Sequence, residues 1–355
     1  MRVRDNLNMA NAGGVLRVAV VGAGSFGRNH ARVYRNLAAD PAQRIELSGI
    51  FDADATRARA IAAEFGARAF GSLDELIIEG RIQAASVAVP TVKHLEVARY
   101  LMERGVDVLI EKPLTTSLAE ADELIALAQR HERIAQVGHL ERFNPAVRAA
   151  LPLLTHPMFF EVHRLSVFTP RSLDVDVVLD LMIHDLDIVL TFAGSPIKEI
   201  RAVGLPILSK KVDIANVRME LESGCVANFT ASRVSTERVR KVRFFQPRQY
   251  LSIDYSRQDL LVLTVNDRLG EDLDPFNPAS VAASAAITPF KPVITQQEPL
   301  RAELASFLHA VHERLQPEVT LEAGRRALAA ALQIARAMDM HARRAHLPEL
   351  TRAQS

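Results

Sequence analysis

The sequence predicts an α/β protein of two domains: a doubly wound parallel sheet, followed by an α+β domain with a mainly antiparallel, open sheet. Up to about residue 137, short β-branched runs alternate with alanine-rich helical segments, as a parallel βαβ sheet requires. After Gly138 the segments become longer and alternate in polarity, which is typical of antiparallel strands. A chain of 355 residues is too long for one ordinary domain and suits two.

The first domain is expected over residues 15–139, after a polar, disordered tail at 1–14. Its expected strands are 16–21, 45–51, 67–70, 84–89, 107–110 and 134–137. Helical patterns fill the intervals, for example 55–65, 93–104 and 117–131. Thr116 and Ser117, with Glu120 close behind, have the spacing of a capping box and predict the start of the last of these helices.

The second domain is expected over residues 140–345. Its strand-like segments are 159–168, 216–221, 225–232 and 239–245. Hairpin-like turns such as 222–224 join several of them. One helix is expected over 177–192 and a helix pair over 299–344, whereas residues 271–298, rich in Pro, Ala and Ser, predict a long loop.

Composition excludes several classes of protein. With 48% hydrophobic residues the chain can bury full-sized cores, and a net charge of +1 argues against a nucleic-acid partner or a membrane surface. The single cysteine, Cys225, excludes an internal disulfide and a multi-cysteine metal site. No stretch offers about 18 uncharged apolar residues, and the first residues contain no apolar signal segment. We therefore expect a cytoplasmic protein.

Three glycines follow the first strand with the spacing of a dinucleotide-binding turn, in the order Gly22-Ala-Gly24-Ser25-Phe26-Gly27. The first permits a tight turn, the second lets the backbone approach a pyrophosphate, and the third lets the next helix pack on the strand. A glycine turn alone is a weak signal, but this one lies between an expected strand and an expected helix. The sequence therefore predicts a Rossmann domain that binds NAD or NADP.

The second expected strand ends at a carboxylate, Asp52. An acid at this place accepts hydrogen bonds from the adenosine ribose hydroxyls and repels a 2′-phosphate. Arg57 could partly offset that repulsion. NAD is therefore expected as the cofactor, in preference to NADP.

Polar residues also follow two later strands of the parallel sheet: Pro90, Thr91 and His94 after one, and Glu111 and Lys112 after the other. Because ligands of open α/β sheets bind at the carboxyl ends of the strands, we expect these residues to contact the cofactor. An ammonium at Lys112, beside the nicotinamide, would stabilise the alkoxide that forms as hydride leaves. The alternative is a solvated surface lysine.

An acid and a histidine, Asp180 and His184, stand four residues apart in an otherwise apolar segment. On a helix they lie on one face, so the carboxylate can orient the imidazole and stabilise its charged form. His184 is therefore a candidate general base. A satisfied core histidine is the alternative. A metal site with Asp185 lacks a recognisable zinc spacing, and no metal is predicted.

The order of these motifs resembles the glucose–fructose oxidoreductase and inositol dehydrogenase family (Gfo/Idh/MocA) over residues 15 to about 344. The motifs are G-x-G-x-x-G, Pro-Thr-x-x-His, Glu-Lys-Pro and Asp-x-x-x-His-Asp. The resemblance implies that a sugar or cyclitol hydroxyl is oxidised against the cofactor, with Lys112, Asp180 and His184 as the catalytic residues. It also implies that an open antiparallel sheet mediates assembly, so a homodimer or homotetramer is expected.

Within that family, residues 136–145 and 211–216 look most like UDP-N-acetylglucosamine 3-dehydrogenases. These enzymes oxidise the sugar 3-hydroxyl before an amine is installed for lipid A or surface polysaccharide. This chain departs from many family members at 173–179, where it lacks a glycine run, and it contains no tryptophan. The resemblance therefore implies a sugar pocket of different shape.

Cations and amides after the domain junction are the candidates for substrate contacts. Arg142, Asn144 and Arg171 are the candidates we select, with a hinge network as the alternative for the first two. Further cations that could pair with a diphosphate are Lys210, Lys211, Arg233, Arg238, Arg240, Lys241 and Arg243. Alternating arginines on a sheet are more often its solvated face or an interface.

Two other functions fit the same fold. One is a dehydrogenase of a cyclitol or an unactivated monosaccharide, which only substrate tests separate from a nucleotide-sugar enzyme. The other is a non-catalytic, dinucleotide-sensing regulator. The intact set of Lys112, Asp180 and His184 speaks against the regulator, because a sensor does not need a base beside the nicotinamide.

Overall fold

The computed structural model describes residues 14–168, 175–265 and 287–346, so all but the last residue of the tail expected at 1–14 lies outside the described residues. The chain divides into two compact units. Unit 1 contains the residues up to Leu140 together with Glu298–Leu328, and unit 2 contains Glu141–Gln297 and the chain from Ala329 onward. None of the helices described is long and apolar enough to cross a membrane.

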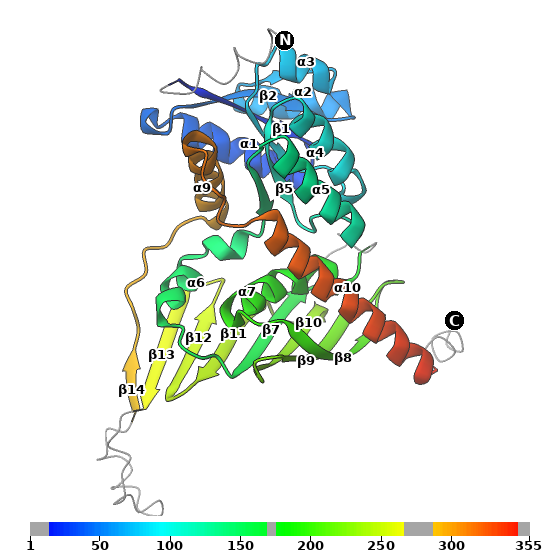
Figure 1. Ribbon diagram of the computed structural model, residues 1–355, viewed down its shortest axis with the longest axis vertical. Coiled ribbons are helices and arrows are strands. Elements are labelled where there is room, and N and C mark those ends of the chain that lie inside the picture. Colours follow the sequence, from blue (N-terminus) through cyan, green and yellow to red (C-terminus); the bar gives the residue numbers. More distant parts are fainter. Residues whose placement is uncertain (1–13, 169–174, 266–286, 347–355) are drawn as a thin grey trace, which may run out of the picture. The chain divides into compact units, whose positions relative to one another are not determined.

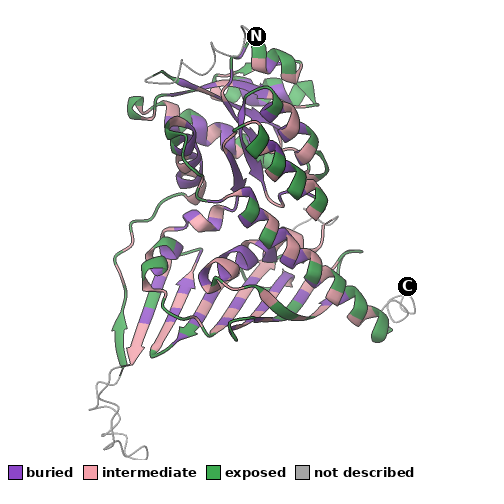
Figure 2. Cartoon of the chain, in the orientation of Figure 1, coloured by how far each residue is buried: buried purple, intermediate pink, exposed green. Residues whose placement is uncertain are grey.

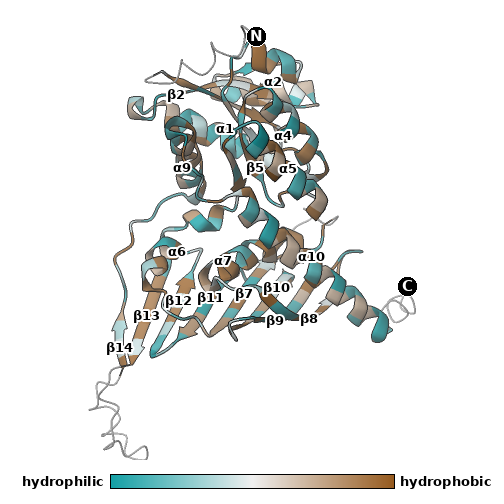
Figure 3. Cartoon of the chain, in the orientation of Figure 1, coloured by the Kyte–Doolittle hydropathy of each residue, from teal (hydrophilic) through white to brown (hydrophobic). Residues whose placement is uncertain are grey.

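Unit 1 is built on a six-stranded parallel sheet in the order β3-β2-β1-β4-β5-β6 (Figure 1). The strands are β1 (Leu16–Val21), β2 (Ile45–Phe51), β3 (Arg68–Ala69), β4 (Ala84–Val87), β5 (Asp107–Glu111) and β6 (Ala135–Gly138). Apart from β3, the strands are largely apolar (Figure 3), as expected where both faces of a sheet are covered. Strand β5 is fully buried. The strand order reverses between β1 and β4, which is where an open α/β sheet binds its ligand.

The helices of unit 1 begin at side-chain caps where the sequence provides them. They are α1 (Ser25–Ala38), α2 (Ala55–Phe65), α3 (Leu73–Ile78), α4 (His94–Glu103), α5 (Leu118–Arg130) and α9 (Pro299–Glu313). The predicted capping box is confirmed. The Ser117 hydroxyl accepts a hydrogen bond from the Glu120 backbone N–H, and the Glu120 carboxylate accepts one from the Ser117 backbone N–H. The expected parallel Rossmann sheet is therefore present.

The position of α9 differs from the sequence prediction, which placed all of 140–345 in the second domain. Residues Glu298–Leu328 belong to unit 1. Leu304, Phe307 and Leu308 of α9 share one buried cluster with Val18 and Val20 of β1. The pattern of α9 predicts an amphipathic helix but not which core receives its apolar face, because that choice depends on contacts about 280 residues away in sequence.

Unit 2 is built on an eight-stranded sheet in the order β14-β13-β12-β11-β7-β10-β9-β8. The strands are β7 (Phe159–Val167), β8 (Ile197–Leu205), β9 (Ile214–Leu221), β10 (Val226–Ser235), β11 (Val239–Gln246), β12 (Gln249–Asp254), β13 (Asp259–Val265) and β14 (Ile287–Phe290). Only the β7–β10 pair is parallel among the pairings described, so the mainly antiparallel prediction is confirmed. Of the loop expected at 271–298, residues 271–286 lie outside the description, and the prediction is wrong at Ile287–Phe290, which form β14.

One face of this sheet is covered by helices and the other is open. The helices of unit 2 are α6 (Pro145–Ala150), α7 (Ile183–Ala193) and the part of α10 (Leu321–Arg344) from Ala329 onward (Figure 1). Along β7, Phe160, Val162 and Arg164 are buried, whereas Glu161 and His163 between them are half-buried. Figure 2 shows this alternation across the neighbouring strands. The period of two assigns one set of side chains to the core and the other to the open face.

We expect Phe307→Ala to destabilise unit 1 by about 3–5 kcal/mol, because a fully buried aromatic ring leaves a cavity between α9 and the sheet. Chemical denaturation of the full chain, followed by circular dichroism, measures the effect. Leu315→Ala, at a half-exposed position just after the same helix, is the control and should change stability by less than about 0.5 kcal/mol. Equal stability of both variants would contradict the packing of α9 in this core.

Candidate functional site

The glycine turn combines two tightly packed glycines with one that faces open space. Gly22 has a φ of 98°, and a Cβ there would lie 2.5 Å from the Ala88 carbonyl oxygen. A Cβ on Gly27 would lie 1.7 Å from the Gly22 carbonyl oxygen. A Cβ on Gly24 would meet no atom within 4 Å. The outer two glycines are therefore required by packing, and the middle one leaves room for a ligand to approach the backbone.

The N-terminus of α1 begins in this turn. Gly24 is its N-cap residue and supplies no side-chain bond, and the first turn contains no acidic residue. Ser25 and Phe26 are exposed there. The first backbone N–H groups of the helix are therefore available to an anion, and the helix dipole favours one. This geometry fits the pyrophosphate of a dinucleotide.

Asp52 lies directly after β2 and faces the same turn. One carboxylate oxygen accepts a hydrogen bond from the Ala23 backbone N–H at 2.6 Å, and the other accepts one from the Asp54 N–H at 2.8 Å. Arg57 lies 3.7 Å away. Each oxygen retains acceptor capacity, so the fixed carboxylate is suited to the two hydroxyls of a ribose.

His94 was expected to contact the cofactor, but the structure buries it within unit 1. Pro90 and Thr91, expected beside it, lie nearer the surface. The His94 Nε2 lies 3.0 Å from the Val89 carbonyl oxygen, and Nδ1 lies 3.0 Å from that of Pro113. Burial lowers the pKa of His94. The ring therefore joins the two loops that follow β4 and β5.

Glu111 is the last residue of β5 and Lys112 directly follows it, but the two side chains are buried to different extents. Lys112 is half-buried, and its bond to Pro113 is cis. Glu111, which we expected at the cofactor, is 7% exposed and lies 2.9 Å from the Nε2 of His30 in α1. Burial would raise the pKa of Glu111, but the hydrogen bond from His30 and the charges of His30 and Lys112 outweigh it and lower the pKa. Glu111 therefore holds the strand end from inside the unit.

A polar network continues from His30 through the interior of unit 1. The His30 Nδ1 lies 2.8 Å from the Ser86 hydroxyl, which lies 2.8 Å from the Tyr34 hydroxyl. All three side chains are fully buried. Because buried polar groups are costly unless they are bonded, this chain fixes the ring orientation of His30 toward Glu111.

Glu303 in α9 is a buried acid that the sequence analysis missed. It is 0% exposed, and among the described residues neither of its carboxylate oxygens has a hydrogen-bond partner. Burial and the charge of Glu111 raise the pKa of Glu303 well above its ordinary value. Both effects favour the neutral, protonated form of the side chain over the carboxylate. The sequence does contain a signal for it: Glu303 stands four residues before Phe307, on the apolar face of α9, and this spacing predicts a buried acid.

In unit 2, Asp180 and His184 lie at the start of the helix that covers the sheet. We expected one regular helix over 177–192, but residues Val178–Met182 form a π-helical turn that leads into α7. Asp180 lies in this wide turn, and His184 lies in the first turn of α7, both half-buried. π-helical turns are rare and are frequently found at functional sites.

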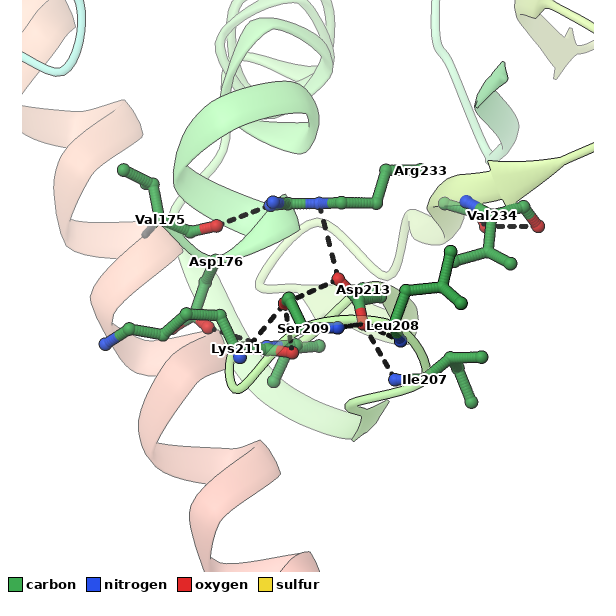
Figure 4. Close-up of polar contacts among 11 residues, drawn as sticks. Val175, Asp176, Ile207, Leu208, Ser209, Lys211, Asp213, Arg233 and Val234 are labelled. Carbon is green, nitrogen blue, oxygen red and sulfur yellow. Dashed lines mark hydrogen bonds and ion pairs between the residues drawn. The ribbon is translucent and has the colours of Figure 1, made fainter. Parts of the chain in front are cut away.

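A loop before β9 is held by one carboxylate (Figure 4). Asp213 accepts hydrogen bonds at 2.6 to 2.8 Å from three successive backbone N–H groups, those of Ile207, Leu208 and Ser209. Burial would raise the pKa of Asp213, but these bonds and the Ser209 hydroxyl outweigh it and lower the pKa. The loop carries Lys210 and Lys211 at the surface.

The same loop holds the segment that enters the π-helical turn. The Val212 N–H donates to the Asp176 carboxylate at 3.0 Å, and the Val177 N–H donates to the Val212 carbonyl at 3.0 Å. Arg233 donates to the Val175 carbonyl and lies 3.8 Å from Asp213 (Figure 4). The backbone just before Asp180 is therefore fixed by contacts from the sheet.

Asp185 was considered as a metal ligand together with Asp180 and His184, but its side chain faces the core of unit 2. Arg164 of β7 donates to its two oxygens at 2.6 and 3.0 Å, and to Glu141 at 3.1 Å. The Tyr255 ring lies 5.2 Å from the same guanidinium. In the parts of the chain that the structure describes, no group of three or more His, Cys, Asp or Glu side chains could hold a metal ion.

The substrate candidates Arg142 and Asn144 lie in buried networks. Arg142 donates to both oxygens of Asp187 at 2.5 and 2.8 Å. The Asn144 amide donates to the Tyr255 carbonyl at 3.0 Å, and its oxygen caps α6. These bonds favour the alternative of a structural hinge network over direct sugar contacts. Arg171 lies outside the described residues.

Two family models match the chain. The model for the oxidoreductase family with an NAD-binding Rossmann fold matches residues 16–139. The model for the GFO/IDH/MocA C-terminal domain matches residues 156–248. The matched ranges correspond to the parallel sheet of unit 1 and to most of the antiparallel sheet of unit 2.

Curated and solved proteins extend this similarity. The chain is 38% identical over 325 residues to the UDP-N-acetylglucosamine 3-dehydrogenase of Acidithiobacillus ferrooxidans, a match that covers 91% of this chain and 97% of that protein. A solved structure of that enzyme superposes with a TM-score of 0.82 and covers 92% of this chain and 98% of that one, at 37% identity. An inositol 2-dehydrogenase of Leifsonia xyli is 33% identical over 193 residues, which cover 52% of this chain and 56% of that protein.

Gly24→Ala should weaken NAD binding at least about tenfold with little loss of stability, because the new methyl group enters only the space beside the helix N-terminus. Calorimetric titration with NAD and a thermal unfolding curve measure the two effects. Gly27→Ala is the contrast: its methyl group collides with backbone, so stability itself should fall. Unchanged NAD affinity in a folded Gly24→Ala variant would rule out this turn as the pyrophosphate site.

The buried acid Glu303 makes the stability of the protein depend on pH. The pKa of Glu303 is raised in the folded state, so its contribution to stability is present at low pH and is lost as the pH rises through that value. Glu303→Gln should therefore be more stable than the natural protein at pH 8, by on the order of 1 kcal/mol, and the difference should shrink toward pH 5. Urea unfolding at both pH values measures it. Glu313→Gln, an exposed change on the same helix, should show no such pH dependence.

Proposed function

The chain belongs to the Gfo/Idh/MocA family of NAD-binding oxidoreductases, and on that premise we propose that it oxidises the 3-hydroxyl of UDP-N-acetylglucosamine with NAD as hydride acceptor. The observation that carries the proposal is the similarity to a UDP-N-acetylglucosamine 3-dehydrogenase over nearly the whole length of both chains. The product would serve lipid A or surface polysaccharide synthesis. Because NAD and nucleotide sugars occur in the cytoplasm, we propose the enzyme acts there.

The residues of unit 1 fit NAD. The open space at Gly24 and the uncapped start of α1 suit the pyrophosphate, and Asp52 suits the adenosine ribose. Bound NAD would supply the acceptor for the hydride that leaves the sugar carbon. The fixed carboxylate of Asp52 also disfavours a 2′-phosphate, which supports NAD over NADP.

We assign the chemistry of the hydroxyl to three residues. The Lys112 ammonium would stabilise the developing alkoxide oxygen. His184 would take the hydroxyl proton, while Asp180, one helical turn earlier, would orient its ring and stabilise its charged form. The O–H proton would go to His184 and the hydride of the C–H bond would go to the acceptor that bound NAD supplies, which would leave the sugar carbon as a ketone.

We also propose a homodimer or homotetramer assembled through the open sheet face of unit 2. On this face Phe159, Phe245 and Tyr250 form a row of rings, with centroid separations of 5.7 and 5.1 Å. Phe245 is 39% exposed in the single chain. Apolar rings within a polar, solvent-facing sheet are typical of a surface that a second copy covers.

The test is reduction of NAD in the presence of UDP-N-acetylglucosamine, with an aminotransferase and L-glutamate added to remove the ketone. Lys112→Met should lower kcat about 10²- to 10³-fold, and His184→Ala should lower it by about 10²- to 10⁴-fold. Lys198→Met changes a lysine of an exposed ion pair in unit 2 and should leave turnover unchanged.

Three outcomes separate the candidate functions. Turnover with myo-inositol or a free sugar instead would favour the cyclitol or monosaccharide dehydrogenase. A dinucleotide-sensing regulator would be favoured by two results together. The protein would bind NAD without turnover of any of these substrates, and Lys112→Met and His184→Ala would keep full cellular function. Turnover that Lys112→Met leaves unchanged would contradict the role of Lys112.

A further inference from the structure

The run of cations before and along β11 separates into two groups in the structure. Three of its five members have a carboxylate partner: Arg233 with Asp213 at 3.8 Å, Lys241 with Asp254 at 3.6 Å, and Arg243 with Glu161 at 3.0 Å. Arg238 and Arg240 have no ion pair with any described residue. The sequence pattern alone could not make this separation, because it depends on which face of the sheet each residue occupies.

Arg240 lies on the face of the sheet that α7 covers. Along β11, Val242 and Phe244 are buried at the next alternate positions, and the Phe244 ring contacts that of Phe192 in α7 at a centroid distance of 5.6 Å. Alternation places Arg240 on the same side as these two residues. Lys241 lies on the opposite, open face.

The half-buried Arg240 guanidinium has other cations as its neighbours. It stands directly across from Arg164 in the β7–β11 pairing, and Arg164 is already bound by Asp185 and Glu141. Burial lowers the pKa of Arg240, and the charges of Arg164 and Arg238 lower it further, against the weaker attraction of the two acids. Both acids are thus bonded to Arg164, Arg240 has no acid of its own, and the charge of the exposed Arg238 adds to the repulsion.

Such an arrangement is unfavourable in the free protein. A partly desolvated cation without its own acid loses hydration that no ion pair restores. A bound anion with several oxygens would restore it, because guanidinium groups bind phosphate oxygens in pairs. The Arg240 guanidinium, partly buried and without an acid of its own, therefore has the character expected of an anion-binding group.

The site is near the proposed catalytic residue within the same unit. Asp185 both contacts Arg164 and directly follows His184 in α7. We propose that Arg240, assisted by the exposed Arg238, binds the diphosphate of the nucleotide-sugar substrate and so directs the sugar to His184. This inference rests on the proposed function, because it assigns the charged part of that substrate to a position in unit 2.

Calorimetric titration with UDP tests the site without any turnover. Arg240→Gln should weaken UDP binding by about tenfold to a hundredfold, the effect of losing one charged hydrogen-bonding partner, and Arg238→Gln should weaken it less. Arg240→Lys, which keeps the charge but not the paired donors, should lie between Arg240→Gln and the natural protein. Arg243→Gln, on the open face of the same strand, is the matched control and should leave UDP affinity unchanged.

In steady-state assays Arg240→Gln should raise KM for the nucleotide sugar with little change in kcat, because the diphosphate is bound equally before and during hydride transfer. Its thermal midpoint should be no lower than that of the natural protein, because the substitution removes an unpaired cation, and its NAD affinity should be unchanged. A folded Arg240→Gln variant with unchanged UDP affinity would overturn the proposal. So would a loss of NAD affinity in place of UDP affinity, since the anion would then belong to the cofactor.

Two further results keep this inference separate from the proposed function. If UDP-N-acetylglucosamine is not oxidised but Arg240→Gln still weakens UDP binding, the diphosphate site stands and the reaction assignment fails. If turnover is observed but neither arginine variant changes KM or UDP affinity, the reaction stands and this site fails. If Arg240→Gln does not fold, unchanged UDP binding by the exposed variant Arg238→Gln, together with unchanged binding by Arg240→Lys, would overturn the proposal.

Discussion

The ion pair between Arg164 and Asp185 is the contact on which the active part of unit 2 depends. It joins β7, inside the sheet, to the first turn of α7, and both side chains are almost fully buried. Removing either partner would leave an uncompensated charge in the core, at a cost of about 3–5 kcal/mol. Because Asp185 is committed to Arg164, it does not form an ion pair with Arg240. The same bond thus fixes the helix of His184 and leaves an unmatched cation beside it.

Unit 1 uses the same arrangement at the end of β5. The acid next to Lys112 is Glu111, buried and bonded to His30, just as the acid next to His184 is buried and bonded to Arg164. In both places an interior contact of a buried carboxylate holds the backbone one residue away from a side chain that we assign to the chemistry. Positioning by a buried neighbour keeps the reactive group free to change its protonation state or partner without loss of its location.

Local patterns predicted the parts of the fold that local forces determine. Apolar runs predicted the parallel strands, the Gly22–Gly27 spacing predicted the turn, and the Ser117 capping box predicted the start of α5. Contacts between distant segments were not predictable in this way. Such contacts decide that His94 faces three carbonyl oxygens and that α9 packs in unit 1. They also decide on which face of β11 each cation lies, since a change of one residue in register reverses the faces.

The return of α9 to unit 1 has a consequence for biosynthesis. The first 140 residues contain every strand of the parallel sheet, yet the buried cluster on one side of that sheet includes residues supplied only by Glu298–Leu328. A nascent chain therefore emerges from the ribosome with that apolar surface uncovered until nearly the whole protein has been made. Vectorial synthesis cannot complete the cofactor-binding half first, and the exposed surface is a natural substrate for chaperones during elongation.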